Sequence, residues 1–378
     1  MLTIEMLAAQ QGDAVWIEYG ARGAIHRVLI DAGTPASADT IKQRIERLPP
    51  DQRRFDLLVV THIDTDHIGG VLKLLTDRPA GLVFDDVWFN AWRHIERIPT
   101  SRLGPIDGEI LSVALDNLNW AWNAKFDGGA VMAGAAGVPP SRTLRGGMTL
   151  TVLSPGAQQL AKLEKNWRSV IRAAGLDPKD PNRWARLLDK AAKKGVSNSI
   201  LGDRLDVAAL GRSRFESDTA PANGSTIALL AEFEGASCLV SGDAYAPVML
   251  DAISRLLEAR GQTRLNVDAF KLPHHGSRYN VSNDLLKAVG SSQYLFSTNG
   301  AIFGHPDDEA VARVLTSSTH STKTLHFNYP AETLRANYAR IKKRVAPSWD
   351  RLRLRKDFRY ETHYAVDDTA GFVLELQR

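Results

Sequence analysis

The chain has 378 residues, of which 44 % are hydrophobic and 24 % are charged, with 47 Lys and Arg against 43 Asp and Glu. These proportions exclude a disordered or collagen-like chain, and the length allows one large α/β domain or two modest ones. The net charge of +4 is compatible with a polyanionic substrate but does not require one.

A single cysteine, Cys238, rules out an intramolecular disulfide and a zinc site built from several thiolates. Residues 1–7 lack the basic start and long apolar core of a signal peptide, and no run of eighteen apolar residues occurs in the sequence. The sequence therefore predicts a cytoplasmic protein that does not associate with a membrane.

The first ninety residues alternate short apolar runs with turns. The runs are rich in β-branched and aromatic residues, which is typical of buried strands, and helical spacing separates some of them. We expect strands at 14–19, 27–30, 55–60, 81–84 and 86–89, and helices at 41–48 and 71–75.

The pattern loosens between residues 100 and 215. A clear strand is expected at 148–153, and the segment 158–194 is helical and basic in pattern. We interpret 100–215 as an insertion or lid-like elaboration within a single domain that spans 1–378.

Strand and helix patterns return after residue 220. We expect strands at 226–230, 236–240, 267–272, 293–297 and 372–376, and helices at 248–260 and 308–315.

Five of the expected strands end in side chains that bind cations. These side chains are Asp31, a dense group within 62–67, Asp243, His275 and His305. Because strand ends converge along one edge of a sheet, ligands that are distant in sequence can meet there. Packing does not explain four ligand-type residues within 62–67, because burying them without partners would be costly.

Imidazole and carboxylate ligands together suit Zn²⁺, Mn²⁺ or Fe²⁺, and the lack of thiolates argues against a purely structural zinc site. Two neighbouring cations would lower the pKa of a bridging water and hold the oxygens of a phosphoryl or acyl centre. The sequence therefore predicts a metal-dependent hydrolase.

The run His62-Ile63-Asp64-Thr65-Asp66-His67 resembles the signature of the metallo-β-lactamase superfamily. Asp64 stands where most members have a second histidine, and this variant resembles the hydrolase domain of bacterial competence DNA-uptake channels and their stand-alone relatives. Segments 11–14, 29–33, 241–243, 271–277 and 304–306 agree with that subgroup. The resemblance implies an α/β fold, a four-layer αββα sandwich with a mostly helical insertion.

The resemblance also implies a ligand set for two divalent ions, Zn or Mn. His62 and Asp64 would hold the first, Asp66 and His67 the second, Asp243 would bridge them, and His275 would complete the second site. Asp66 would also orient the attacking hydroxide.

Further roles are expected around this set. His274 is a catalytic or substrate-facing candidate, and Asp31 would orient a histidine ligand from behind. Asn223, with Ser225 beside it, stands where the superfamily usually supplies a histidine, so the first site would be loose, Mn²⁺-preferring or vacant. His305 would stabilise developing charge or protonate a leaving group, or else would only cap the following helix.

The resemblance favours a nuclease or phosphodiesterase that cuts DNA or RNA through a metal-activated hydroxide. Basic clusters at 168–194 and 342–359 fit phosphate contacts or solvated faces equally, and we take Lys271, Arg353 and Arg355 as nucleic-acid contacts. Alternatives are hydrolysis of a small ester, lactone or cyclic nucleotide, and a non-catalytic member that binds a partner. Relatives suggest nucleic-acid turnover or antiviral defence beside a protein partner, and the sequence does not predict the oligomeric state.

Overall fold

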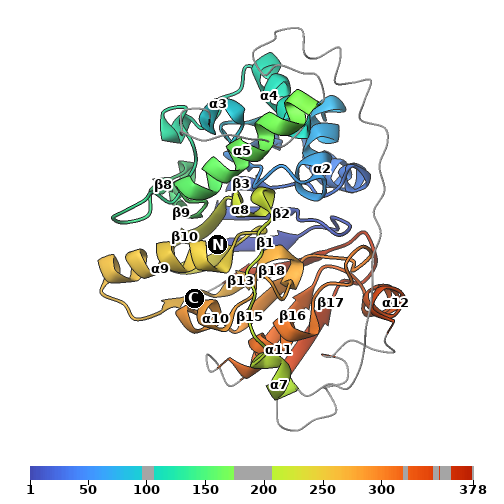
Figure 1. The fold of residues 1–378 in the computed structure, drawn as a ribbon. Coiled ribbons are helices and arrows are strands. Elements are labelled where there is room, and N and C mark those ends of the chain that lie inside the picture. Colours follow the sequence, from blue (N-terminus) through green and yellow to red (C-terminus); the bar gives the residue numbers. More distant parts are fainter. Residues whose placement is uncertain (96–105, 174–206, 318–321, 344–348, 350–358, 377–378) are drawn as a thin grey trace.

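Two large sheets form the centre of the molecule in a computed structural model that describes residues 1–95, 106–173, 207–317, 322–343, 349 and 359–376 (Figure 1). The first sheet has the order β18 (Phe372–Leu376), β1 (Leu2–Met6), β2 (Val15–Ala21), β3 (Ala24–Ile30), β5 (Leu57–Val59), β7 (Val87–Trp88). The second has the order β17 (Tyr360–Tyr364), β16 (Lys323–Phe327), β15 (Gln293–Phe296), β13 (Ala269–Lys271), β11 (Ala236–Val240), β10 (Ala228–Phe233), β9 (Thr149–Ser154), β8 (Ser141–Thr143). Two short pairs accompany them, β4 (Arg54–Phe55) with β6 (Val83–Phe84) and β12 (Leu265–Asn266) with β14 (Val289–Gly290).

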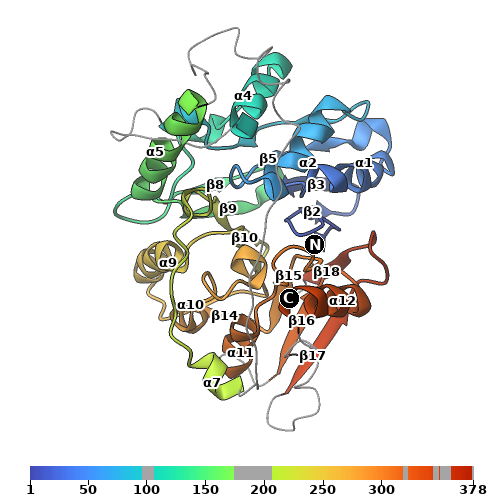
Figure 2. The ribbon, with the colours of Figure 1, turned by 45° about the vertical axis from the view of Figure 1, so that its right-hand side comes forward.

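Helices cover the outer faces of both sheets (Figures 1 and 2). On the side of the first sheet lie α1 (Ala38–Glu46), α2 (Thr65–Thr76), α3 (Trp92–Ile95), α4 (Ile106–Leu118) and α5 (Ala157–Ala173). On the side of the second lie α9 (Ala246–Arg260), α10 (Asn283–Ala288), α11 (Asp308–Thr316) and α12 (Ala331–Lys342). The short helices α7 (Val207–Gly211) and α8 (Pro221–Gly224) complete the described set.

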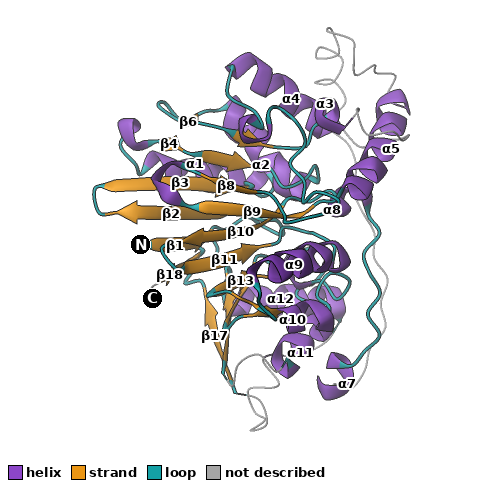
Figure 3. Ribbon diagram, turned by 90° about the vertical axis from the view of Figure 1, so that its left-hand side faces the viewer, coloured by secondary structure: helices purple, strands orange, loops and turns teal. Residues whose placement is uncertain are grey.

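Side-chain alternation along the strands separates the core into three layers. Val15 and Ile17 of β2 face the space between the sheets, while Trp16 packs under the helices of the first sheet. Likewise, Cys238 of β11 lies between the sheets, and Leu239 packs under α9. Because side chains of a strand point to alternate faces, three apolar layers require four layers of backbone. The expected αββα sandwich is therefore confirmed, as Figure 3 shows.

The region 100–215 contributes more to this sandwich than a helical insertion would. Its helices α4 and α5 pack on the first sheet's side, but β8 and β9 pair with each other, and β9 continues the second sheet next to β10. The rest of the expected helical segment, 174–194, lies outside the described residues. Within the described helices, none combines the length and apolar character needed to cross a bilayer.

Helix α2 approaches the loop after β3 so closely that no side chain fits between them. A Cβ on Gly70 would lie 1.8 Å from the carbonyl oxygen of Ala32, and the Gly70 amide donates to Gly33 O at 2.9 Å. This contact fixes the start of α2, and therefore His67, against the loop that carries Asp31.

We expect Gly70→Ala to destabilise the protein by about 1–3 kcal/mol because the added methyl group must displace backbone. At an unconstrained helical position the same change would stabilise it by up to about 1 kcal/mol. Chemical denaturation measures the difference, with Thr76→Ala at the exposed end of α2 as the control. An unchanged or increased free energy of unfolding for Gly70→Ala would contradict the close contact.

Candidate metal centre

The polar side chains that follow the strands gather at one edge of both sheets. Strands β3 and β5 are parallel neighbours in the first sheet, and β11, β13 and β15 are parallel neighbours in the second. Their carboxyl ends therefore lie at the same edge and deliver Asp31, His62, Asp243 and His275 to one place. The convergence expected from the sequence is confirmed.

One group of side chains surrounds the Oδ1 atom of Asp243. His67 Nε2 lies 3.4 Å from this oxygen, and His275 Nε2 lies 3.7 Å from it. Asp66 Oδ2 is 3.6 Å from His275 Nε2, and ligand atoms of Asp66, His67 and His275 all lie within 4.8 Å of one another. This group matches the second site expected from the sequence.

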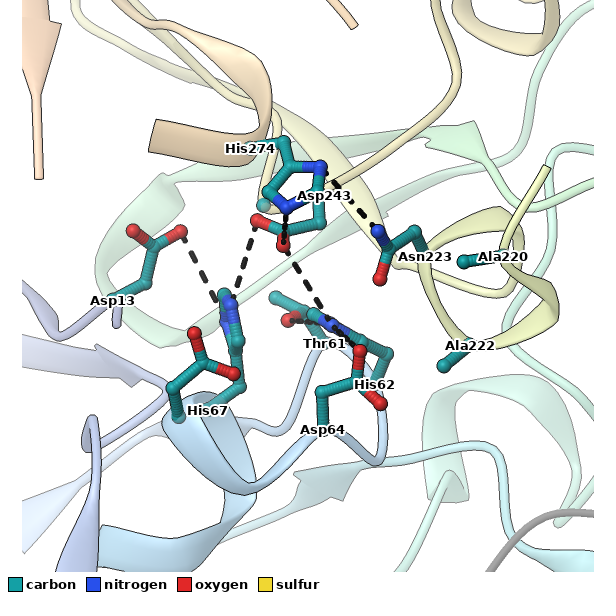
Figure 4. A network of polar contacts seen from close by, with 12 residues as sticks. Asp13, Thr61, His62, Asp64, His67, Ala220, Ala222, Asn223, Asp243 and His274 are labelled. Carbon is teal, nitrogen blue, oxygen red and sulfur yellow. Dashed lines mark hydrogen bonds and ion pairs between the residues drawn. The ribbon is translucent and has the colours of Figure 1, made fainter. Parts of the chain in front are cut away.

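A second group faces the other oxygen of the same carboxylate (Figure 4). His62 Nε2 lies 4.0 Å from Asp243 Oδ2 and 3.7 Å from Asp64 Oδ2. His274 Nε2 lies 3.6 Å from Asp243 Oδ2. The Asp64 side chain is 43 % exposed, so this group opens to solvent while His67 is fully buried. The expected bridging position of Asp243 fits the geometry.

The buried atoms at the centre have no hydrogen-bond partner within the described chain. These atoms are His62 Nε2, His67 Nε2, His275 Nε2 and Asp243 Oδ1. Buried polar atoms in proteins are almost always satisfied, so several unsatisfied ligand atoms that face one another fit a site built for a cation and not a packing defect. Imidazole nitrogen and carboxylate oxygen are the donors that Zn²⁺ and Mn²⁺ accept, so the residues fit a metal centre.

Asp31 orients the site from behind, as expected. Its Oδ2 accepts hydrogen bonds from His67 Nδ1 at 2.8 Å and from Thr61 Oγ1 at 2.6 Å, and its Oδ1 accepts from the Thr61 amide at 2.7 Å. Because Asp31 accepts a hydrogen bond from His67 Nδ1, the proton stays on Nδ1 and an unprotonated Nε2 faces the centre.

Asp13 also lies behind the histidines. It approaches the Nδ1 atoms of His275, at 3.3 Å, and of His67, at 4.0 Å. Clusters that include Asp13 would also satisfy simple distance criteria for a metal site. We favour the clusters around Asp243, because three Nε2 atoms and Asp243 Oδ1 face one another there without hydrogen-bond partners among the described residues, although Asp13 Oδ1 also lacks one.

The charges of these groups are strongly interdependent. Burial alone would lower the pKa of His275, but the carboxylates of Asp243 and Asp13 raise it to about 9. Burial alone would raise the pKa of Asp243, but His274, His67 and His275 hold it well below its ordinary value. A cation that binds here therefore replaces protons on the imidazoles, so binding releases protons and weakens in acid.

His305 lies at the rim of the site, and it does not cap a helix. Its ring centroid is 5.6 Å from that of His274 and 6.5 Å from that of His275. Asp307, not His305, is the residue at the start of α11. The capping alternative is therefore wrong. Burial, opposed in part by Asp307, lowers the pKa of His305, so the ring is neutral near pH 7.

Other expected residues have different positions from those proposed. Lys271 is fully buried, and its ammonium pairs with Asp13 and donates to Gly242 O at 3.1 Å. Its role as a nucleic-acid contact is wrong, because a β13 side chain that points inward cannot reach a surface ligand. Arg353 and Arg355 lie outside the described residues.

Asn223 and Ser225 both belong to the turn at α8. Asn223 is buried beside His274, and its Oδ1 has no hydrogen-bond partner in the described part of the chain. The Ser225 hydroxyl donates to Ala222 O at 2.6 Å. Ser225 therefore supports the turn that carries Asn223.

Two polar residues in this network carry no recognisable sequence signal. Asp218 Oδ2 accepts from Asn223 Nδ2 at 2.7 Å and lies 3.4 Å from His274 Nδ1. Asn280 Oδ1 lies 3.0 Å from the same nitrogen. Asp218 follows the loosely patterned region and Asn280 follows the histidine turn, so neither ends a recognisable strand.

A family model matches the N-terminal part of the chain. Residues 9–141 match the model of the metallo-beta-lactamase superfamily. No curated protein matches the chain. Solved structures with a similar course of the chain include the metallo-beta-lactamase fold protein YhfI from Bacillus subtilis, with 9 % identity, a TM-score of 0.36 and 99 % of both chains covered.

Two further similar structures differ in their described chemistry. The diiron β-hydroxylase CmlA from Streptomyces venezuelae has 13 % identity and a TM-score of 0.37, with 99 % of this chain and 54 % of that chain covered. The long form of RNase Z from yeast has 10 % identity and a TM-score of 0.35, with 100 % of this chain and 48 % of that chain covered. At these values the similarities do not indicate an activity.

Proposed function

We infer, for a chain that has the metallo-β-lactamase fold, that it is a metal-dependent hydrolase that cleaves phosphodiester bonds of DNA or RNA. The observation that carries the hydrolase assignment is the position of Asp243, whose two oxygens each face a separate pair of imidazoles. Such an arrangement suits two neighbouring divalent cations, Zn²⁺ or Mn²⁺, which when bound lower the pKa of a water and stabilise negative charge on the substrate.

Side chains of the protein orient the attacking water, accept its proton and hold the histidine ligands in place. Asp66 is 22 % exposed and lies at the open side of the second group, where its carboxylate can orient a water and accept its proton. His305 is neutral and within ring contact of His274, so it can donate a hydrogen bond to an oxygen that gains charge. Buried Asp31 and Thr61 keep His67 from turning away.

Exposed aromatic rings at the rim support a nucleic-acid substrate. Phe303 is 45 % exposed and its ring centroid lies 5.6 Å from that of His305. Tyr279 is 38 % exposed, and the Arg278 guanidinium lies 4.8 Å from the centroid of its ring. Exposed aromatic rings stack on bases and arginines contact phosphates, so these side chains suit a single-stranded substrate. The resemblance of the 62–67 motif to a DNA-uptake hydrolase domain supports the same substrate.

A hollow of about 210 Å³ lies beside Tyr279. It is lined by Ser213, Arg214, Glu216, Arg278, Tyr279, Glu309 and Arg313. Arg278 pairs with Glu309 at 3.1 Å, and Arg313 is buried and donates to the backbone carbonyls of Arg278 and Val281, so Arg214 is left as the phosphate contact that we propose for this hollow.

Cleavage of labelled single- and double-stranded DNA and RNA with Mn²⁺, Zn²⁺ or Mg²⁺ tests the proposal. We expect cleavage by the wild type, a loss of about 10²–10⁴-fold for Asp66→Ala, and wild-type rates for Asp77→Ala at the exposed end of α2. Affinity for single strands should fall with salt, with a logarithmic slope of roughly −0.7 per phosphate contacted.

Other outcomes would contradict the proposal. Hydrolysis of a lactone, an ester or a cyclic nucleotide without cleavage of any nucleic acid would assign a small substrate instead. If binding of nucleic acid does not depend on salt, the residues at the rim do not contact its phosphates.

A further inference from the structure

Four imidazoles, not three, surround the Asp243 carboxylate. On the Oδ1 side are His67 and His275, at 3.4 and 3.7 Å. On the Oδ2 side are His62 and His274, at 4.0 and 3.6 Å. Each oxygen therefore faces two imidazole nitrogens, and the two halves of the centre have the same composition.

All four rings have the same orientation relative to the centre. Nδ1 of each ring has a polar partner on the outer side, which is Asp31 Oδ2 for His67 and the Ser297 carbonyl for His275. For His62 the partner is Thr61 Oγ1, at 3.0 Å. A proton held on Nδ1 by such a partner leaves the Nε2 lone pair free for a cation, which is the arrangement seen behind histidine ligands.

His274 has the most polar outer environment of this kind. Asn280 Oδ1 lies 3.0 Å from its Nδ1 and Asp218 Oδ2 lies 3.4 Å from it. Asn223 Nδ2 donates to Asp218, and Asn280 Nδ2 donates to the carbonyl oxygen of Asp243 at 3.1 Å. The residues that orient His274 are thus connected to the strand end that carries the shared carboxylate.

The backbone explains how two adjacent histidines reach opposite halves of one site. His274 and His275 have φ values of 48° and 55°, and Gly276 follows with φ 84°. Left-handed backbone is uncommon for residues with a Cβ and is retained where the surroundings demand it. The His274 amide also donates to Gly242 O at 2.9 Å, which fixes the turn beside Asp243. The ring centroids end 5.7 Å apart with planes at 75°.

We propose that His274 is a ligand of the first cation, and that it supplies the imidazole which Asn223 does not provide. Asp218 and Asn280 position its ring. The unpartnered Asn223 Oδ1 faces the same half of the centre, away from the His274 side of its amide (Figure 4). The first site then contains two imidazoles and Asp64 in addition to the shared carboxylate. This assignment rests on the two-cation centre of the proposed function, and it does not depend on the substrate.

Metal content of purified protein, with titration by Co²⁺ followed in the visible spectrum, tests the assignment. We expect two equivalents in the wild type and in His363→Ala, a control at a 59 % exposed histidine on β17. In His274→Ala we expect one tightly bound equivalent, with the affinity for the second at least about 100-fold weaker. In Asp218→Asn we expect that affinity to fall about 10- to 100-fold, because the ring is still present but less well oriented.

Two results would overturn the assignment. One is a second equivalent that binds His274→Ala as tightly as the wild type, and the other is a wild type that takes up fewer than two equivalents. If His274→Ala does not fold, long-range ¹H–¹⁵N spectra of wild-type histidines decide instead, since Zn²⁺ must shift four Nε2 resonances rather than three. Loss of one equivalent in His274→Ala without cleavage of any nucleic acid would retain the assignment and overturn only the proposed substrate.

Discussion

Replacing Asp243 by asparagine is expected to reduce hydrolysis by about 10³-fold or more, because one substitution weakens both halves of the metal centre. Asparagine keeps the shape of the side chain but removes the charge that faces His67 and His275 on one side and His62 and His274 on the other. A neutral amide is a weak ligand and bridges two cations poorly. We therefore expect metal content to fall from two equivalents to one or fewer, with no recovery in excess metal.

Steady-state turnover together with metal content measures this effect. Asp251→Asn is a matched control, because Asp251 is 70 % exposed on α9 and pairs with Arg255 at the surface. Such a pair contributes at most about 1 kcal/mol, so this variant should retain two equivalents and wild-type turnover. A fully active Asp243→Asn protein with two bound equivalents would show that the carboxylate does not bridge.

Asp31→Asn is expected to lower metal affinity by about 10- to 100-fold while leaving the ligands themselves intact. All three hydrogen bonds of Asp31 are accepted from donors, from His67 Nδ1, Thr61 Oγ1 and the Thr61 amide. An asparagine must place its NH₂ group against one side of this set, where a donor would face a donor. Asp31 has φ 58°, a conformation that asparagine tolerates, so backbone strain does not confuse the result.

The dependence on metal concentration distinguishes this variant from Asp243→Asn. Turnover of Asp31→Asn should recover substantially in excess Zn²⁺ or Mn²⁺, because the direct ligands remain. Asp39→Asn is the control. Asp39 is 64 % exposed on α1 and pairs with Lys73 of α2. Wild-type affinity in Asp31→Asn would mean that His67 is held in place without this carboxylate.

The metal centre was predictable from sequence because its ligands obey a local rule. The residues Asp31, Asp243 and His275 each follow a strand, and parallel strands bring their carboxyl ends together. The layer order was implied by the resemblance of the 62–67 motif, and apolar runs such as 236–240, which lie in strands buried on both faces, agree with it.

What the sequence missed depends on contacts between distant parts of the chain. The side chain of Lys271 pairs with Asp13, 258 residues away, and nothing around either residue indicates that pairing. Asp218 joins the site through His274, across 56 positions. Strand β17, Tyr360–Tyr364, was also missed, because alternating exposed polar residues at a sheet edge do not form an apolar run.

A crystal structure of the protein with Mn²⁺, with anomalous difference maps, tests the metal centre most directly. We predict two peaks about 3.5–4 Å apart. One should contact Asp243 Oδ1 with His67 and His275, and the other Asp243 Oδ2 with His62 and His274. The absence of any peak at Asp243, or a single ion held by the Asp13 side of the histidines, would contradict the centre described above.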